Sequence, residues 1–265
     1  MKKYGFLFLV MVLSVITGCS KSSNDDPAPT KIDKSANLLG TGDSAHDILS
    51  NDTFDKLLIE AAYVQDFRPT EEAMDNFVTF LKERTFKQDV EVLYRELNSP
   101  NETDLTLQEL ADFEEENRLE YNNGGTLAIY IYFADAPSED DEEEEGLVTL
   151  GAVYRNTSMV IYEKTVRELA GQSSQITDAD VETATLNHEF GHLFGLVDLG
   201  TAQVNDHQDP DAINHCNVPG CLMRAELLFG GGLMSMLESR VSKGLVMAPG
   251  LGDECILDLQ NNGGR

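Results

Sequence analysis

The chain has 265 residues, of which 47 are acidic and 19 basic, and its formal net charge is −28. A surface this acidic repels phosphate groups, which argues against nucleic acid and anionic lipid headgroups as binding partners. The length suits one domain with a sizeable apolar core, which we place at residues 36–265, with an upper lobe at 36–195 and a lower lobe at 196–265.

The first residues have the composition of an export signal. Lys2 and Lys3 precede an apolar run at residues 6–16 that is too short to span a bilayer, which is typical of a signal peptide. The Thr-Gly-Cys that follows resembles the lipobox of bacterial lipoproteins, and this resemblance implies a signal peptide at 1–18 and acylation of Cys19. The simpler alternative is an ordinary signal peptide with a chance cysteine. We expect a lipoprotein of the bacterial cell envelope, anchored in the membrane on the periplasmic side or the outer surface.

Residues 19–35 are mostly Ser, Asn, Asp, Pro and Lys. Such a stretch has almost nothing to bury, so it predicts a flexible tether between the anchor and the domain. The fold is therefore expected to begin near residue 36.

Apolar periodicity and turn residues predict an α+β chain, in which strands and helices come first and an irregular C-terminal lobe follows. The predicted elements, in chain order, are a strand or short helix at 56–64, a helix at 70–84, a strand at 89–97, a helix at 106–118, a central strand at 126–134, a hairpin of strands at 147–154 and 158–164, a helix at 178–194, and shorter helices near 233–239 and 253–259. Thr106 and Glu109 form a capping box. Thr177 is placed to cap the last long helix, which we expect to end at Gly195.

The helix predicted at 178–194 carries the residues that point to chemistry. His188 and His192 are four apart, so they share one helix face and can put two neutral imidazole nitrogens on one metal ion. Glu189 lies beside them, where its carboxylate can act as general base toward a water at the metal. The alternative is a helix with two ordinary surface histidines. The helix cap, the glycine stop and the export signal make that interpretation the weaker one.

From His188 onward, the pattern His-Glu-x-x-His-x-x-Gly resembles the metzincin clan of zinc peptidases. A second segment, from His215 to Met223 with the pattern His-Cys-x-x-x-x-Cys-x-Met, is similar to that of archaemetzincins. The resemblance implies an α+β fold with a mixed twisted sheet and an active-site helix, and it places Met223 in a turn beneath the metal. It also implies that a peptide substrate binds along an edge strand above the cleft, for which the candidate is 158–164.

The third metal ligand has three candidates. His215 stands in the segment that resembles archaemetzincins, Asp198 has the metzincin spacing after the helix-ending glycine, and His207 has a neighbouring acid that could orient its ring. We prefer His215 because its separation from Met223 matches the archaemetzincin segment, and because a long loop between helix and ligand is thermodynamically tolerable. Asp198 and His207 stay open as alternatives.

Three cysteines remain once Cys19 is assigned to the lipid. Cys216 and Cys221 are close enough in sequence to close a small disulfide loop in an oxidising compartment, which leaves Cys255 free or able to replace one of them. Archaemetzincins complete a second, four-cysteine zinc site with a Cys-x-x-Cys pair that is absent here. The resemblance therefore implies one Zn²⁺ ion per chain.

The function that these residues predict is zinc-dependent hydrolysis of peptide bonds in a peptide or protein substrate, by a chain that we expect to be monomeric. One rival is a surface lipoprotein of the same fold that binds a peptide or a glycan without turnover. Another is a gluzincin-type peptidase, whose third ligand is a glutamate on a later helix, such as Glu226 or Glu238. Gly195 and Met223 favour the metzincin interpretation, since a gluzincin needs neither.

Overall fold

The structure is a computed structural model that describes residues 33–141, 148–227, 230–245 and 248–265. The chain separates into two compact units, Met1–Lys31 and Ile32–Arg265, and all the described residues belong to the second. The predicted signal peptide, the predicted lipidation site at Cys19 and nearly all of the tether therefore lie outside the described residues. Ser35, the last residue of the predicted tether, already opens a 3-10 turn at Ser35–Asn37.

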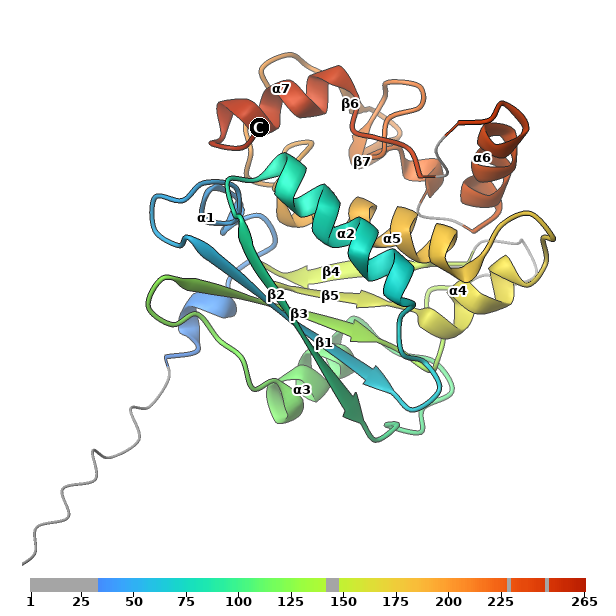
Figure 1. Ribbon diagram of the computed structural model, residues 1–265, viewed down its shortest axis with the longest axis horizontal. Helices are drawn as coiled ribbons and strands as arrows, with labels where there is room; N and C mark the ends of the chain where they lie inside the picture. Colours follow the sequence, from blue (N-terminus) through green and yellow to red (C-terminus); the bar gives the residue numbers. More distant parts are fainter. Residues whose placement is uncertain (1–32, 142–147, 228–229, 246–247) are drawn as a thin grey trace, which may run out of the picture. The chain divides into compact units, whose positions relative to one another are not determined.

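A five-stranded, mostly parallel sheet forms the centre of this unit (Figure 1). Its strands are β1 (Lys56–Val64), β2 (Asp89–Leu97), β3 (Thr126–Phe133), β4 (Gly151–Arg155) and β5 (Ser158–Ile161). They lie in the order β2-β1-β3-β5-β4, with β1 parallel to β2 and β3, β3 parallel to β5, and β4 antiparallel to β5. The interior strands β1 and β3 are almost wholly buried, as apolar runs covered on both faces should be.

Helices cover both faces of the sheet. They are α1 (Ala45–Leu49), α2 (Glu71–Arg84), α3 (Leu107–Asn117), α4 (Glu163–Ala170), α5 (Asp178–Leu193), α6 (Gly230–Ser242) and α7 (Asp253–Asn261). Side chains of α2 and α5 form one apolar cluster with the sheet, whereas α3 contributes to a second cluster on the opposite face (Figure 1). Between α5 and α6 lies a short hairpin of β6 (Gln208–Asp209) and β7 (Ala212–Cys216).

Local sequence signals predict most of these elements. Residues 56–64, which the sequence leaves undecided, form strand β1. The predicted capping box starts α3, with Thr106 Oγ1 accepting from Glu109 N at 3.0 Å. The predicted hairpin forms β4 and β5, although residue 147 lies outside the described part of the chain. The prediction of an α+β chain with a mixed sheet is confirmed.

The sequence also predicts that the strand that forms the substrate-binding edge of the sheet lies at 158–164, and this prediction is wrong. Strand β5 ends at Ile161 and lies between β3 and β4, with all its residues buried. From Glu163 onward the chain already forms α4. The physical reason is that β5 pairs in parallel with β3, from Tyr130 opposite Ser158 onward. Strand β4, which pairs with β5 alone among the described strands, therefore forms the edge.

Helix α5 has the cap and the stop that the sequence predicts. Thr177 Oγ1 accepts from Asp180 N at 3.3 Å, and the carboxylate of Asp180 accepts from Thr177 N at 2.8 Å. The helix ends in a Schellman motif, in which Gly195, at φ +70°, allows Leu196 N to donate to Gly191 O. The chain therefore turns sharply away from the helix soon after its last histidine.

Candidate metal centre

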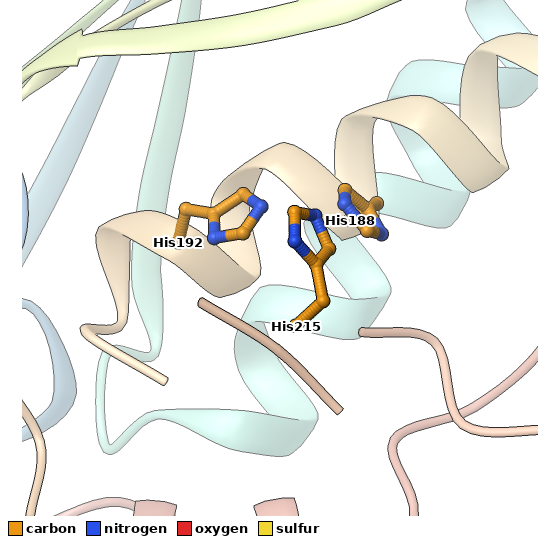
Figure 2. Close-up of side chains that lie close together, drawn as sticks. All are labelled: His188, His192 and His215. Atoms are coloured by element: carbon orange, nitrogen blue, oxygen red, sulfur yellow. The ribbon is translucent and has the colours of Figure 1, made fainter. Parts of the chain in front are cut away.

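Two helical residues and one strand residue bring three imidazoles together. His188 and His192 lie one turn apart on α5 and are buried, with ring centroids 5.0 Å apart. Strand β7 supplies His215, whose ring centroid is 5.4 Å from that of His188 and 5.0 Å from that of His192. Figure 2 shows the three rings gathered beside α5, and one ring nitrogen from each lies within 4.8 Å of the others. The structure thus groups the two helical histidines with the preferred third candidate.

Backbone carbonyl groups decide which ring nitrogens stay free. His188 Nδ1 donates to the carbonyl oxygen of Leu222 at 2.7 Å, and His215 Nδ1 donates to that of Ile213 at 2.9 Å. A carbonyl oxygen can only accept, so Nδ1 carries the proton and Nε2 keeps its lone pair. Nε2 of both residues, and Nδ1 of His192, are buried without a hydrogen-bond partner in the described part of the chain. Three imidazoles with free, buried nitrogens fit a metal ion.

The three histidines are held in the neutral form that metal binding requires. Burial lowers the pKa of His188 to about 4, with a further contribution from nearby His215. Burial also lowers the pKa of His192 well below its usual value, and that of His215 to a smaller extent. Neutral imidazoles offer lone pairs at neutral pH without first losing a proton.

Glu189, the predicted general base, is next to His188 on α5. Its side chain is 2% exposed. Burial raises the pKa of its carboxyl group to about 8, because the charged form loses its hydration. A carboxylate in this environment is more basic than one on the protein surface.

Met223 packs directly against α5 at Gly191. A Cβ at Gly191 would lie 2.2 Å from Met223 Sδ, so only glycine lets the sulfur approach the helix this closely. The neighbouring carbonyl of Leu222 holds His188. Met223 O accepts from Cys216 N at 2.7 Å, which ties the turn to β7. The turn that contains Met223 therefore positions His188 and anchors the strand that carries His215.

The other candidate ligands lie outside this group. Asp198 is exposed, in the left-handed region at φ +69°. Glu226 accepts from Arg224 Nη2 at 3.1 Å, and Glu238 is exposed on α6. His207 is buried, but it belongs to a different cluster of side chains.

That second cluster consists of His207, Cys216, Cys221 and Cys255, and we call it the thiol cluster. His207, Cys216 and Cys255 each offer an atom within 4.8 Å of the others, and Cys221 Sγ lies 3.5 Å from Cys255 Sγ. All four side chains are buried. His207 Nε2 donates to Asp258 Oδ2 at 2.7 Å, which leaves Nδ1 facing Cys216 Sγ at 3.3 Å.

The expected disulfide between Cys216 and Cys221 is not formed, and all three cysteines are free thiols. Cys216 and Cys221 instead belong to one buried group of hydrogen-bonded thiols that also includes Cys255. Cys216 Sγ faces the ring of His207, whereas Cys221 Sγ faces Cys255 and accepts from Gly252 N at 3.2 Å. Hydrogen bonds from the thiols of Cys216 and Cys255 lower the pKa of Cys221.

No pattern in the sequence predicts this cluster. Its members come from the loop before β6, from β7, from the turn at Met223 and from α7. No short spacing pattern joins Cys255 to the other three, and the acid that orients His207 is Asp258 on α7 rather than a residue next to it in sequence. The one available signal was the leftover cysteine itself.

Comparisons with known proteins add little to this geometry. No model of a protein family matches the sequence, and no curated protein matches it. Among solved structures, the chain is similar to the crystal structure of archaemetzincin from Methanopyrus kandleri, with 17% sequence identity and a TM-score of 0.48. The match covers 78% of this chain and 94% of that chain. At this identity and TM-score we draw no functional argument from the likeness.

Proposed function

We propose that the chain is a zinc-dependent peptidase in which His188, His192 and His215 bind the metal and Glu189 is the general base. The observation that carries the proposal is the convergence of three neutral imidazoles, two buried and one half-buried, whose free nitrogens lie beside a buried carboxyl group. Zinc favours nitrogen ligands of this kind, and three protein ligands leave a position for water or substrate.

The chemistry of the proposal divides between the metal and one side chain. Zinc, when bound, supplies a Lewis acid that polarises a substrate carbonyl and acidifies a water molecule. Glu189 accepts the proton of the attacking water and passes it to the leaving amine. Burial makes its carboxylate a stronger base, since the pKa is raised to about 8. The positive charge of a bound metal favours the ionised form of this carboxyl group at neutral pH.

A peptide is the substrate class that the sheet edge favours. Strand β4 forms the edge, and it packs against the helix that carries Glu189. An extended peptide can add to such an edge through main-chain hydrogen bonds, which are available to any sequence. The substrate strand would then lie beside the base.

Two rival functions are less well supported. A receptor without turnover needs no general base, yet Glu189 is buried beside the histidines. A gluzincin needs a glutamate as third ligand, but Glu226 is paired with Arg224 and His215 occupies the place beside the two helical histidines.

The decisive experiment for the proposed function is Glu189→Gln. The amide keeps the size of the side chain but cannot accept the proton, so cleavage of casein should fall by about 10²–10⁴-fold while bound zinc stays at the wild-type level. Zinc is measured by atomic absorption on the same sample. Wild-type cleavage by Glu189→Gln would show that the base lies elsewhere.

We also propose that the protein is exported and anchored in a bacterial envelope membrane by acylation of Cys19, on the strength of the N-terminal sequence pattern. In the part of the chain that the structure describes, no helix is both long and apolar enough to cross a membrane. Labelled fatty acid should enter the wild-type protein and not Cys19→Ala. Equal labelling of the two proteins would rule out this anchor.

The thiol cluster supports a second proposal about metal content. We propose that His207, Cys216, Cys221 and Cys255 bind a structural zinc, which revises the expected count from one ion to two. Three thiols and one imidazole form a typical closed tetrahedral set. Asp258 holds the ring of His207 in the tautomer that leaves Nδ1 free for the metal. The backbone N–H groups of Gly252 and Met223 donate to Cys221 Sγ, which would stabilise a thiolate.

A further inference from the structure

The first residue of the edge strand is a glycine that lies against the proposed base. Gly151 opens β4 and pairs with Ile161 at the end of β5. A Cβ built on Gly151 would lie 2.6 Å from Glu189 Cγ, 3.1 Å from Glu189 Cδ and 3.1 Å from Thr185 Cγ2. Carbon atoms in favourable contact are about 3.5–4.0 Å apart, so any side chain here would collide with that of Glu189.

Backbone conformation does not explain the glycine. Gly151 is absent from the glycines of the described chain that have a positive φ. An alanine could therefore adopt the same backbone angles without strain. The remaining reason for glycine at this position is space, and the space is occupied by the side chain of Glu189.

We propose that Gly151 is a positioning residue for the general base, an inference that rests on the proposed peptidase function. The Cγ and Cδ atoms of Glu189 occupy the space that a side chain at residue 151 would need, so a methyl group there would push the carboxylate away from the reacting water. Strand β4 is also the edge to which a peptide substrate would add. Strand β4 would therefore position both the substrate and Glu189. The distance between the scissile bond and the base would then be set by the strand backbone and not by a further side chain.

The test begins with Gly151→Ala in the full-length protein loaded with zinc. Displacement of the carboxylate by about 1 Å should lower kcat about 100-fold. KM should stay within about twofold of the wild-type value, because the backbone of β4 remains available to the substrate. Zinc content should be unchanged. The matched control is Gly250→Ala, since a Cβ there meets nothing within 4 Å and its φ is not positive.

A second pair of variants needs no activity and covers the case in which Gly151→Ala folds poorly. Thermal unfolding of metal-free protein is compared for Gly151→Ala in two backgrounds, with Glu189 and with Glu189→Ala. The substitution should lower the unfolding midpoint clearly when Glu189 is present and much less when its side chain is removed. Thr185→Ser in place of Glu189→Ala deletes the other methyl contact, and it should restore less of the midpoint.

The outcomes separate this inference from the proposed function. Wild-type kcat in Gly151→Ala, together with an inactive Glu189→Gln, would overturn the role of Gly151 and leave the peptidase proposal standing. An equal drop of the unfolding midpoint in both backgrounds would overturn it as well, because the methyl group would then be colliding with something other than Glu189. An active Glu189→Gln would instead refute the peptidase mechanism.

Discussion

At the candidate metal centre, backbone carbonyl groups fix the tautomer of two histidine rings in the metal-free protein. Leu222 O and Ile213 O each accept a hydrogen bond from an imidazole Nδ1–H, which leaves His188 Nε2 and His215 Nε2 free. A ring held in one tautomer and one orientation loses little freedom when it binds a metal. The ring of His215 is therefore already oriented to bind a metal through Nε2. Asp198, by contrast, is exposed on a turn that leaves α5.

This difference predicts the result of substituting each candidate ligand. His215→Ala should lose one bound zinc relative to wild type and nearly all casein cleavage, because two histidines hold zinc much more weakly than three. Asp198→Asn, the control, should keep the wild-type zinc content and activity. Zinc is counted by mass spectrometry under native conditions. The assignment is wrong if Asp198→Asn loses the ion and His215→Ala keeps it.

Helix geometry alone could predict only the helical half of the site, and it left His215 as one of three candidate ligands. His188, Glu189 and His192 lie within five residues, so helix geometry alone places them together. The choice of His215 over Asp198 depends on the β6–β7 hairpin, which carries His215 back to α5 and which the sequence analysis did not predict. The contact of Gly151 with Glu189 depends on a sheet register that local patterns do not contain.

At the level of elements, two buried carboxyl groups join α4 to the active-site helix. Glu163 on α4 and Glu182 on α5 are both fully buried. Glu163 accepts from Arg167 Nε at 2.6 Å, and Glu182 accepts from Thr70 N at 3.0 Å. Burial, reinforced by the nearby charge of Glu182, raises the pKa of Glu163 to about 10 despite Arg167. Glu163 therefore carries its proton at neutral pH.

The protonated Glu163 makes stability depend on pH. The pKa of this carboxyl is 4.5 in an ordinary setting and about 10 in the fold, so between these values the folded state holds the proton and the unfolded state does not. Its contribution is complete below the lower value and is lost as pH rises toward the upper one, by up to about 1.4 kcal/mol per pH unit.

Glu163→Gln should remove this dependence. Urea unfolding at pH 6, 7 and 8 should give a smaller loss of unfolding free energy with rising pH for Glu163→Gln than for wild type. Glu168→Gln is the control, because Glu168 is exposed on the same helix and should leave the slope unchanged. Parallel slopes for wild type and Glu163→Gln would contradict the raised pKa.

The elements themselves were predictable where their signals are local. The capping boxes at Thr106 and Thr177 fix the starts of α3 and α5, and Gly195 fixes the end of α5. The order of strands was not predictable in the same way. The sequence predicts a hairpin of strands at 147–154 and 158–164, but tertiary packing decides which of the two strands pairs with β3.

On the scale of the whole described unit, the thiol cluster connects four segments of the chain that follow α5. Cys216 belongs to β7, Cys221 to the turn at Met223, and Cys255 to α7, while His207 precedes β6. A metal bound by all four would cross-link the chain after α5, where secondary structure is sparse. Binding free energy at such a site adds to folding free energy, because the unfolded chain has no preformed site.

Cys255→Ser should therefore lose one zinc and stability together. We expect one ion fewer than wild type and a thermal midpoint lower by about 5–10 °C, which corresponds to roughly 2–3 kcal/mol at about 2–4 °C per kcal/mol for a domain of this size. His215→Ala serves as the comparison, since it removes the other ion. A Cys255→Ser protein with the wild-type zinc content would show that the cluster binds no metal.

Three consecutive residues, Cys221, Leu222 and Met223, face three different partners. The first presents its sulfur to the thiol cluster, the second its carbonyl to His188, and the third its side chain to Gly191. Each contact depends on a position along the chain, so gaining or losing one residue there would misplace all three. Pro210 and Asp211 are exposed at the tip of the β6–β7 hairpin, where a longer loop changes the free energy of loop closure by only about 0.6 kcal/mol per doubling of length. In natural variants, insertions and deletions should therefore gather between β6 and β7 and spare the turn at Met223.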